Sequence, residues 1–90
     1  MMTNAPSVYN VLKAIEDLAS RRADPYATRN EIAKCLDVQP DDISREGLPD
    51  TGPLGQAVEE GLIEQNPKYA GYWRLTPEGQ TWLDSAMLNG

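Results

Sequence analysis

The stretch GLIEQNPKYAGYWRLTPEGQTWL, residues 61–83, constrains the fold of this chain more than any other segment. Residues 62–65 and 72–75 are short, apolar-rich runs typical of strands, and the Asn, Pro and Gly residues of 66–71 are typical of a turn. Residues 76–78, Thr-Pro-Glu, have the pattern of a helix start, with a capping threonine and a proline at the first helical position. The segment therefore predicts a β-hairpin that leads directly into a helix.

The returning strand of this hairpin is expected to have one buried face and one exposed face. Alternation along it places Trp73 and Leu75 on one face and Tyr72 and Arg74 on the other. We expect Trp73 to lie in the core beneath the hairpin. The apolar side of the following helix is predicted to consist of Trp82, Leu83, Ala86 and Met87, with Trp82 either in the core or at a dimer surface.

Helices are also predicted in the first half of the chain. The first has Ser7 as its N-cap and carries Arg21 and Arg22 in its last turn, where cations suit the helix dipole. The second begins at Thr28, which has the capping-box spacing to Glu31. Apolar residues at helical spacing are Val8, Val11, Leu12, Ile15, Leu18 and Ala19 in the first helix, and Ile32, Leu36 and a buried, unreactive Cys35 in the second.

A loop and a short third helix connect this half to the hairpin. Residues 37–52 are rich in Asp, Pro, Gly and Ser, as in a loop, and could hold one irregular helical turn anchored by Ile43. The third helix is expected at residues 51–60, with Pro at its first position and Gly61 as a left-handed stop. Tyr26 is expected either to pack on the first helix or to belong to a short strand.

The composition limits the classes of function that are open to the chain. It has 90 residues, which predicts a single domain over 1–90, and it contains no histidine and a single cysteine. Histidine-based acid–base catalysis, most zinc sites and an internal disulfide are therefore excluded. No phosphate-binding glycine loop is present, so we expect no enzyme activity, cofactor or metal. Without a long apolar run or a visible secretory signal, we expect no membrane partner and a cytoplasmic location.

Two segments of the chain resemble winged helix-turn-helix transcriptional regulators of bacteria and archaea. GLIEQ…YWRLTPEGQTWL is similar to the hairpin "wing" of that family, and TRNEIAKCLDV resembles the helix before its turn. The resemblance covers roughly a third of the chain. It implies an α+β, mostly helical fold with three core helices, a β-hairpin wing and a C-terminal helix. It also implies that the 51–60 helix takes the recognition position and that residues 66–71 form the wing tip.

A regulator of this family binds double-stranded DNA, and the resemblance places the contacts on three elements. Arg29 and Asn30 lie at the start of the second helix, where backbone N–H groups also suit phosphate. On the recognition helix, Gln56 is a candidate reader of adenine. The complete set of predicted DNA-binding residues is Arg29, Asn30, Thr51, Gln56, Lys68, Tyr69 and Arg74.

The charge of the chain opposes this interpretation. The net charge is −6, and residues 28–61 hold three Lys or Arg residues against eight Asp or Glu residues. The predicted recognition helix has no cation and ends in Glu59 and Glu60, although DNA binding depends on cations placed against phosphates. A protein-interaction module that offers this acidic face to a basic protein, or that imitates nucleic acid, is therefore the alternative. A homodimer through the first or last helix also stays open.

Overall fold

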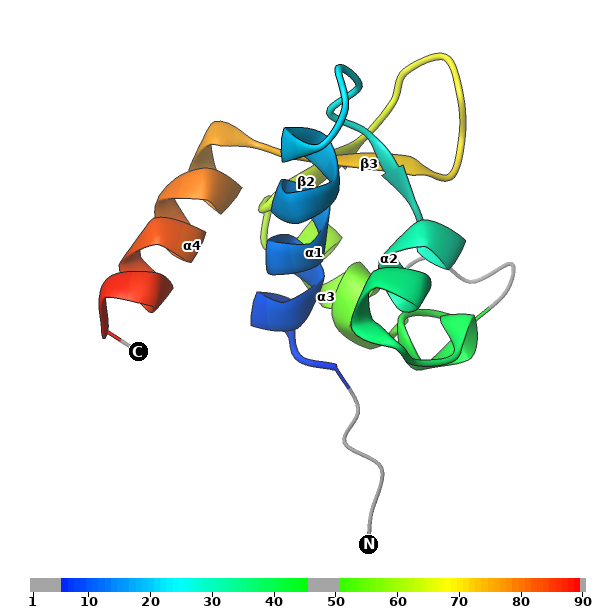
Figure 1. Cartoon of the computed structure of the whole chain (residues 1–90), viewed down its shortest axis with the longest axis horizontal. Coiled ribbons are helices and arrows are strands. Elements are labelled where there is room, and N and C mark those ends of the chain that lie inside the picture. The colour runs from blue at the N-terminus through cyan, green and yellow to red at the C-terminus, as the bar shows by residue number, and fades with distance from the viewer. Residues whose placement is uncertain (1–5, 46–50, 90) are drawn as a thin grey trace, which may run out of the picture.

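The chain folds as an α+β unit in which helices surround a small antiparallel sheet. The structure is a computed structural model that describes residues 6–45 and 51–89, with the backbone alone for 87–89. These residues form four α-helices, three strands and one turn of 3₁₀-helix (Figure 1). The elements in chain order are α1 Val8–Ser20, β1 Ala27–Thr28, α2 Arg29–Leu36, the 3₁₀ turn Pro40–Asp42, α3 Gly52–Glu59, β2 Ile63–Gln65, β3 Tyr72–Leu75 and α4 Pro77–Asn89.

The predicted hairpin is present, and a third strand extends it. β2 and β3 pair antiparallel with Ile63 opposite Leu75, and the strand order is β1-β3-β2. The added strand β1 starts one residue after Tyr26, and Ala27 pairs with Trp73 on the far side of β3. Trp73 therefore lies in the central strand of the sheet.

The alternation predicted for β3 is confirmed. Trp73 is 5% exposed, whereas Tyr72 and Arg74 are exposed. Trp73 belongs to the hydrophobic core, and α1 packs against β3 there. In Figure 1, α1 runs through the centre of the molecule. The hydrophobic core residues with at most 1% exposure are Val11, Leu12, Ala14, Ile15, Ala27, Ile32, Ala33, Ile43, Leu54, Ala57 and Leu83.

Local side-chain hydrogen bonds begin the first two helices where the sequence places them. The Thr28 hydroxyl accepts the Glu31 backbone N–H at 3.2 Å, and the Glu31 carboxylate accepts the Thr28 backbone N–H at 3.0 Å, which is the predicted capping box. Ser7 caps α1 as expected, and Asn10 closes a similar box there. Each pair satisfies backbone donors that the first helical turn leaves free.

The prediction for the end of α1 was wrong. The helix ends at Ser20, so Arg21 is its C-cap residue and Arg22 lies beyond it. The two guanidinium nitrogens of Arg22 donate to the Glu31 carboxylate at 2.8 and 3.0 Å, and one of them also donates to the Tyr26 carbonyl. This arginine therefore ties the α1–β1 loop to the start of α2 instead of lying along the end of α1.

The Arg22–Glu31 pair predicts a pH-dependent stability. The hydrogen bond from Arg22, with that from the Thr28 backbone, lowers the pKa of Glu31 from 4.5 to about 2. A carboxylate with a depressed folded-state pKa stabilises the fold above pH 4.5, and this contribution is lost as the pH falls toward 2. Because both side chains are more than a third exposed to solvent, we expect only about 1 kcal/mol.

Urea unfolding between pH 6 and pH 2.5 would test this contribution in the wild type and in Glu31→Gln. The glutamine variant keeps the capping hydrogen bond but loses the charge. We expect the variant to be less stable at pH 6 and the difference to shrink as the pH falls below 4.5 toward 2.5. A difference that stays constant over this range would contradict the assigned pair.

The connection to α3 contains the predicted helical turn. Ile43 follows the 3₁₀ turn and is completely buried, so it anchors this loop to the core. α3 begins after Thr51, buries Leu54 and ends before Gly61, whose φ of 76° is the expected left-handed stop. Residues 46–50 of the predicted 37–52 loop lie outside the described residues.

The prediction for α4 holds in part. Leu83 is completely buried, but Trp82 is 36% exposed and so does not belong to the core. Ala86 is half-buried, and the Met87 side chain lies outside the described residues. Cys35 is likewise half-buried against the core rather than fully enclosed. Within residues 6–45 and 51–89, no helix has the length and apolar character required to cross a bilayer.

Candidate nucleic-acid interface

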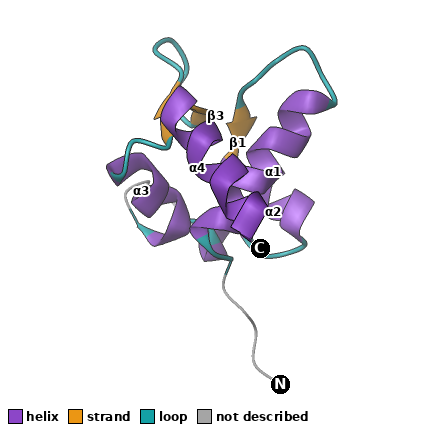
Figure 2. Cartoon of the chain, turned by 90° about the vertical axis from the view of Figure 1, so that its left-hand side faces the viewer, coloured by secondary structure: helices purple, strands orange, loops and turns teal. Residues whose placement is uncertain are grey.

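The helix α3 and the hairpin loop 66–71 lie on the same side of the molecule. Figure 2 shows both on the side away from α1 and α2. Residues of α3 and of the hairpin, Leu54, Gln65 and Gly71, also line one shared hollow. The two elements to which the sequence assigns DNA contacts are therefore neighbours in space.

The exposed side of α3 is acidic. The exposed side chains of α3 are Gln56 and Glu59, and its C-cap residue Glu60 is exposed as well, so this surface presents no cation to solvent. The Gln56 amide donates to the Glu60 carboxylate at 3.0 Å, which occupies one donor of the predicted adenine reader. Gln56 also borders a hollow that it shares with Tyr9 and Trp82, not the hollow beside the hairpin. These contacts weaken the assignment of Gln56 to base reading.

Arg29, at the start of α2, holds the α2–α3 connection in place. One of its terminal nitrogens donates to the Ser44 carbonyl at 2.7 Å and to the Asp41 carboxylate at 3.1 Å. The side chain is only 23% exposed, because it bridges these two parts of the connection. Asn30, next to it, is exposed. Arg29 thus has a structural role in addition to any contact with a phosphate.

Arg74 is exposed on β3, as predicted, but it is paired. Its guanidinium lies 2.6 Å from the Glu64 carboxylate on the neighbouring strand, and it stacks 5.4 Å from the centre of the Tyr26 ring. The hydrogen bond to Glu64 raises the pKa of Arg74. The register of the hairpin, which sets Glu64 opposite Arg74, is the signal that could have predicted this pair. Arg74 offers little free charge to DNA.

The hairpin loop presents a cation and an aromatic pair. The Asn66 side chain accepts the backbone N–H groups of Lys68 and Tyr69, which fixes the loop and leaves both side chains exposed. Tyr69 is 62% exposed and meets Tyr72 edge to face, with 6.1 Å between the ring centres. Lys68 forms no ion pair with the residues that the structure describes.

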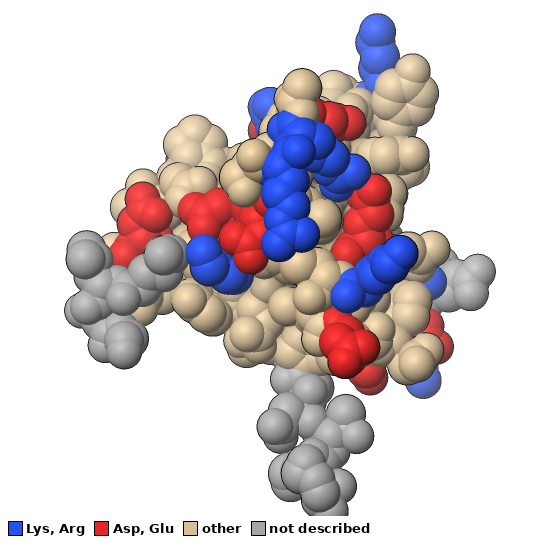
Figure 3. All heavy atoms as spheres, viewed as in Figure 1, with Lys and Arg blue, Asp and Glu red and all other residues tan. Residues whose placement is uncertain are grey.

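The opposite side of the molecule has no continuous basic surface. Figure 3 shows basic and acidic side chains interleaved on the side that α1 and α2 occupy. Several of these groups are paired: Lys13 lies 3.2 Å from Glu16 and 3.6 Å from Asp17, and Arg22 pairs with Glu31. This side therefore offers no evident track for a phosphate backbone.

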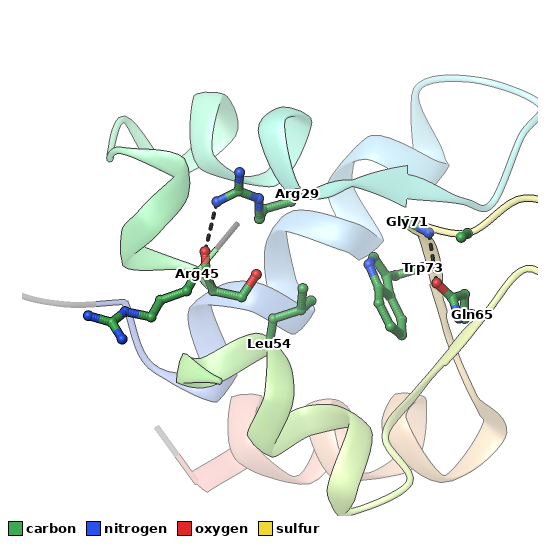
Figure 4. A pocket seen from close by; sticks show the side chains of 8 residues that line it. Arg29, Arg45, Leu54, Gln65, Gly71 and Trp73 are labelled. Carbon is green, nitrogen blue, oxygen red and sulfur yellow. Dashed lines mark hydrogen bonds between the residues drawn. The ribbon is translucent and has the colours of Figure 1, made fainter. Parts of the chain in front are cut away.

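A hollow of about 220 Å³ separates α2 and α3 from the hairpin. Figure 4 shows Arg29 and Trp73 on opposite sides of this space, with Leu54 between them and the Arg45 guanidinium pointing away. The lining residues are Arg29, Ser44, Arg45, Leu54, Gln65, Ala70, Gly71 and Trp73, so two arginines and no acidic residue border it. No sequence motif groups these residues, because the loop, helix and hairpin that supply them are separate in the chain.

Comparison with other proteins assigns no family. No protein-family model, curated protein or solved structure matches this chain. Among the described residues, no group of three acidic or cysteine side chains could hold a metal ion.

Thr51, another of the predicted DNA-contact residues, also takes part in local structure, because its hydroxyl accepts the Arg45 backbone N–H at 2.9 Å.

Proposed function

We propose that the chain is a small winged-helix transcriptional regulator that binds double-stranded DNA through α3 and the hairpin loop. The order of the helices and the hairpin matches the arrangement implied by the resemblance to that family. The observation that carries the proposal is the hairpin loop. This loop presents exposed Lys68 and Tyr69 on the side where α3 lies, next to the exposed Tyr72 of β3, which suits contact with a phosphate backbone.

Binding of this kind is expected to be modest in affinity and sensitive to salt. The wing supplies Lys68, the loop before α3 supplies Arg45, and Asn30 adds a polar contact at the start of α2. Glu59 and Glu60 are exposed on α3 and repel phosphate. This distribution of charge favours phosphate contacts made by the wing over base reading by α3.

Charge substitutions test the proposed docking. Lys68→Ala should weaken binding to duplex DNA and reduce the slope of log affinity against log salt by about 1. Glu59→Gln combined with Glu60→Gln should tighten binding, because two like charges are removed from the interface. Fluorescence anisotropy with a labelled duplex at about 50 mM and 150 mM salt measures both effects.

Lys34→Ala is the matched control. Lys34 is also exposed, but it lies on α2 beside Leu18 and Arg21, away from the hairpin. The Lys34→Ala substitution changes the net charge by the same amount as Lys68→Ala, but it should reduce the affinity for DNA less. Equal effects of the two substitutions would show that only net charge affects binding and would contradict the proposed docking.

The acidic side of α3 favours a second candidate function. Gln56, Glu59 and Glu60 form an exposed polar stripe without a cation, which suits a basic protein surface. If no duplex binds at about 50 mM salt, this protein-interaction module becomes the better explanation. The double glutamine variant should then slow association with the basic partner instead of tightening DNA binding.

A further inference from the structure

One of the residues that line the hollow between α2, α3 and the hairpin, Ser44, carries a buried hydroxyl that the fold leaves unsatisfied. Ser44 is 2% exposed, and its hydroxyl has no hydrogen-bond partner in the described structure. Its carbonyl, by contrast, accepts a hydrogen bond from Arg29 at 2.7 Å. A buried hydroxyl without a partner costs folding free energy, and such a group is rare enough in a native protein to require an explanation.

The surroundings of this hydroxyl define the kind of molecule that would satisfy it. Arg29 uses one terminal nitrogen for Ser44 and Asp41, so the rest of its guanidinium remains available to donate. Arg45 also lines the space, although its guanidinium points away from it, and no acidic residue is part of the lining. Although the net charge of the chain is −6, the lining of this hollow contains arginine and no carboxylate, so it favours an anion.

The other residues that line the hollow include apolar side chains, and the volume of the hollow limits the size of the ligand. Leu54 is buried at 1% exposure and Trp73 at 5%, and Figure 4 shows both facing the space next to Arg29. The volume of about 220 Å³ exceeds the roughly 150 Å³ of a cavity that holds benzene. A single ring with a small acidic substituent therefore fits the hollow.

We infer that this hollow binds a compact organic anion, consisting of a ring-sized apolar body and a carboxylate or phosphate group. The anionic group accepts hydrogen bonds from the Ser44 hydroxyl and the Arg29 guanidinium, while Leu54 and Trp73 contact the apolar body. The site lies between the two elements proposed to dock on DNA. It does not depend on that function, since the ligand contacts only this chain.

The test uses benzoate, phenyl phosphate and the neutral benzamide as probes, without DNA. Trp82→Phe provides the background, because it leaves Trp73 as the one tryptophan and Trp82 does not line this hollow. We expect saturable changes in Trp73 fluorescence with one or both anions and at least tenfold weaker binding of benzamide. Amide NMR should locate the largest shifts at Arg45, Gly71 and the Trp73 indole N–H. Benzoate and phenyl phosphate then distinguish a carboxylate ligand from a phosphate ligand.

Ser44→Ala is the decisive variant. It should weaken anion binding about tenfold, because one hydrogen bond to a charged group is lost. It should leave the unliganded domain at least as stable as the parent, because the unpaired hydroxyl is removed. Arg45→Ala should weaken binding less than Ser44→Ala, because the Arg45 guanidinium points away from the hollow, and Arg21→Ala, at the exposed end of α1, should leave binding unchanged. Absence of shifts with both anions, equal binding of benzamide, or an unchanged affinity in Ser44→Ala would each overturn the inference.

Discussion

Trp73→Ala is expected to destabilise the domain by about 3–5 kcal/mol, the usual cost of emptying an aromatic site in a core. Trp73 is 5% exposed and lies in the central strand, where its backbone pairs with Ala27 on one side and Gln65 on the other. Removal of the ring takes contacts from α1 and from the sheet together. Since one edge of the ring borders the hollow, water can fill part of the space, which favours the lower half of this range.

Tyr72→Ala is the control for this substitution. Tyr72 is the preceding aromatic residue of the same strand, but it is 41% exposed and its main ring contact is with Tyr69. We expect a loss of about 1 kcal/mol or less, typical of one exposed aromatic pair. Urea unfolding followed by far-UV circular dichroism measures both variants without relying on tryptophan emission. Similar losses in the two variants would mean that the faces of β3 are assigned wrongly.

The parts of the fold that sequence reasoning predicted depend on neighbours in the chain. The capping box of Thr28 and Glu31 spans three residues, and the stop at Gly61 needs only a residue that accepts a left-handed backbone. The alternation in β3 is equally local, since successive side chains of a strand point to opposite faces. Such signals stay readable without knowledge of the tertiary structure.

The features that were missed depend on contacts between distant segments. β1 has two residues, and only its pairing with β3, some 45 positions later, makes it a strand. Arg29 was predicted from its place at the start of α2, but Asp41 and Ser44 in the following connection determine what it binds. Whether a surface cation is free for DNA thus depends on folding, not on its position in a motif.

Trp82 shows a different limit of periodicity. Trp82 and Leu83 are consecutive, and successive residues of a helix point about 100° apart, so both cannot face the same neighbour squarely. α4 packs mainly on α1, where the Gln80 amide also donates to the Glu16 carboxylate at 2.8 Å. Leu83 takes the buried position, and Trp82 remains at the surface. A homodimer through this exposed ring remains a prediction.

Gly79→Ala is expected to destabilise the domain by about 3 kcal/mol, although alanine is normally the better helix former by about 1 kcal/mol. Gly79 lies in the first turn of α4, is buried, and donates its backbone N–H to the Thr76 hydroxyl at 2.9 Å. A β-carbon on Gly79 would overlap the carbonyl oxygen of Leu62. This oxygen cannot move away easily, because it accepts the Thr76 backbone N–H at 3.0 Å.

The same substitution at Gly61 separates this steric effect from backbone strain. Gly61 has a φ of 76° and open space around the position of a β-carbon, so Gly61→Ala should cost only about 1–2 kcal/mol, the strain of a left-handed alanine. The urea unfolding midpoints of both variants and of the wild type show which loss of stability is larger, that from the steric clash at Gly79 or that from the backbone strain at Gly61. If Gly79→Ala instead stabilised the domain by the helix-propensity gain, the close approach of α4 to Leu62 would be refuted. The glycine of the Thr-Pro-Glu-Gly sequence is thus expected to be required because a helix start lies directly against a neighbouring backbone, and not because the chain turns there.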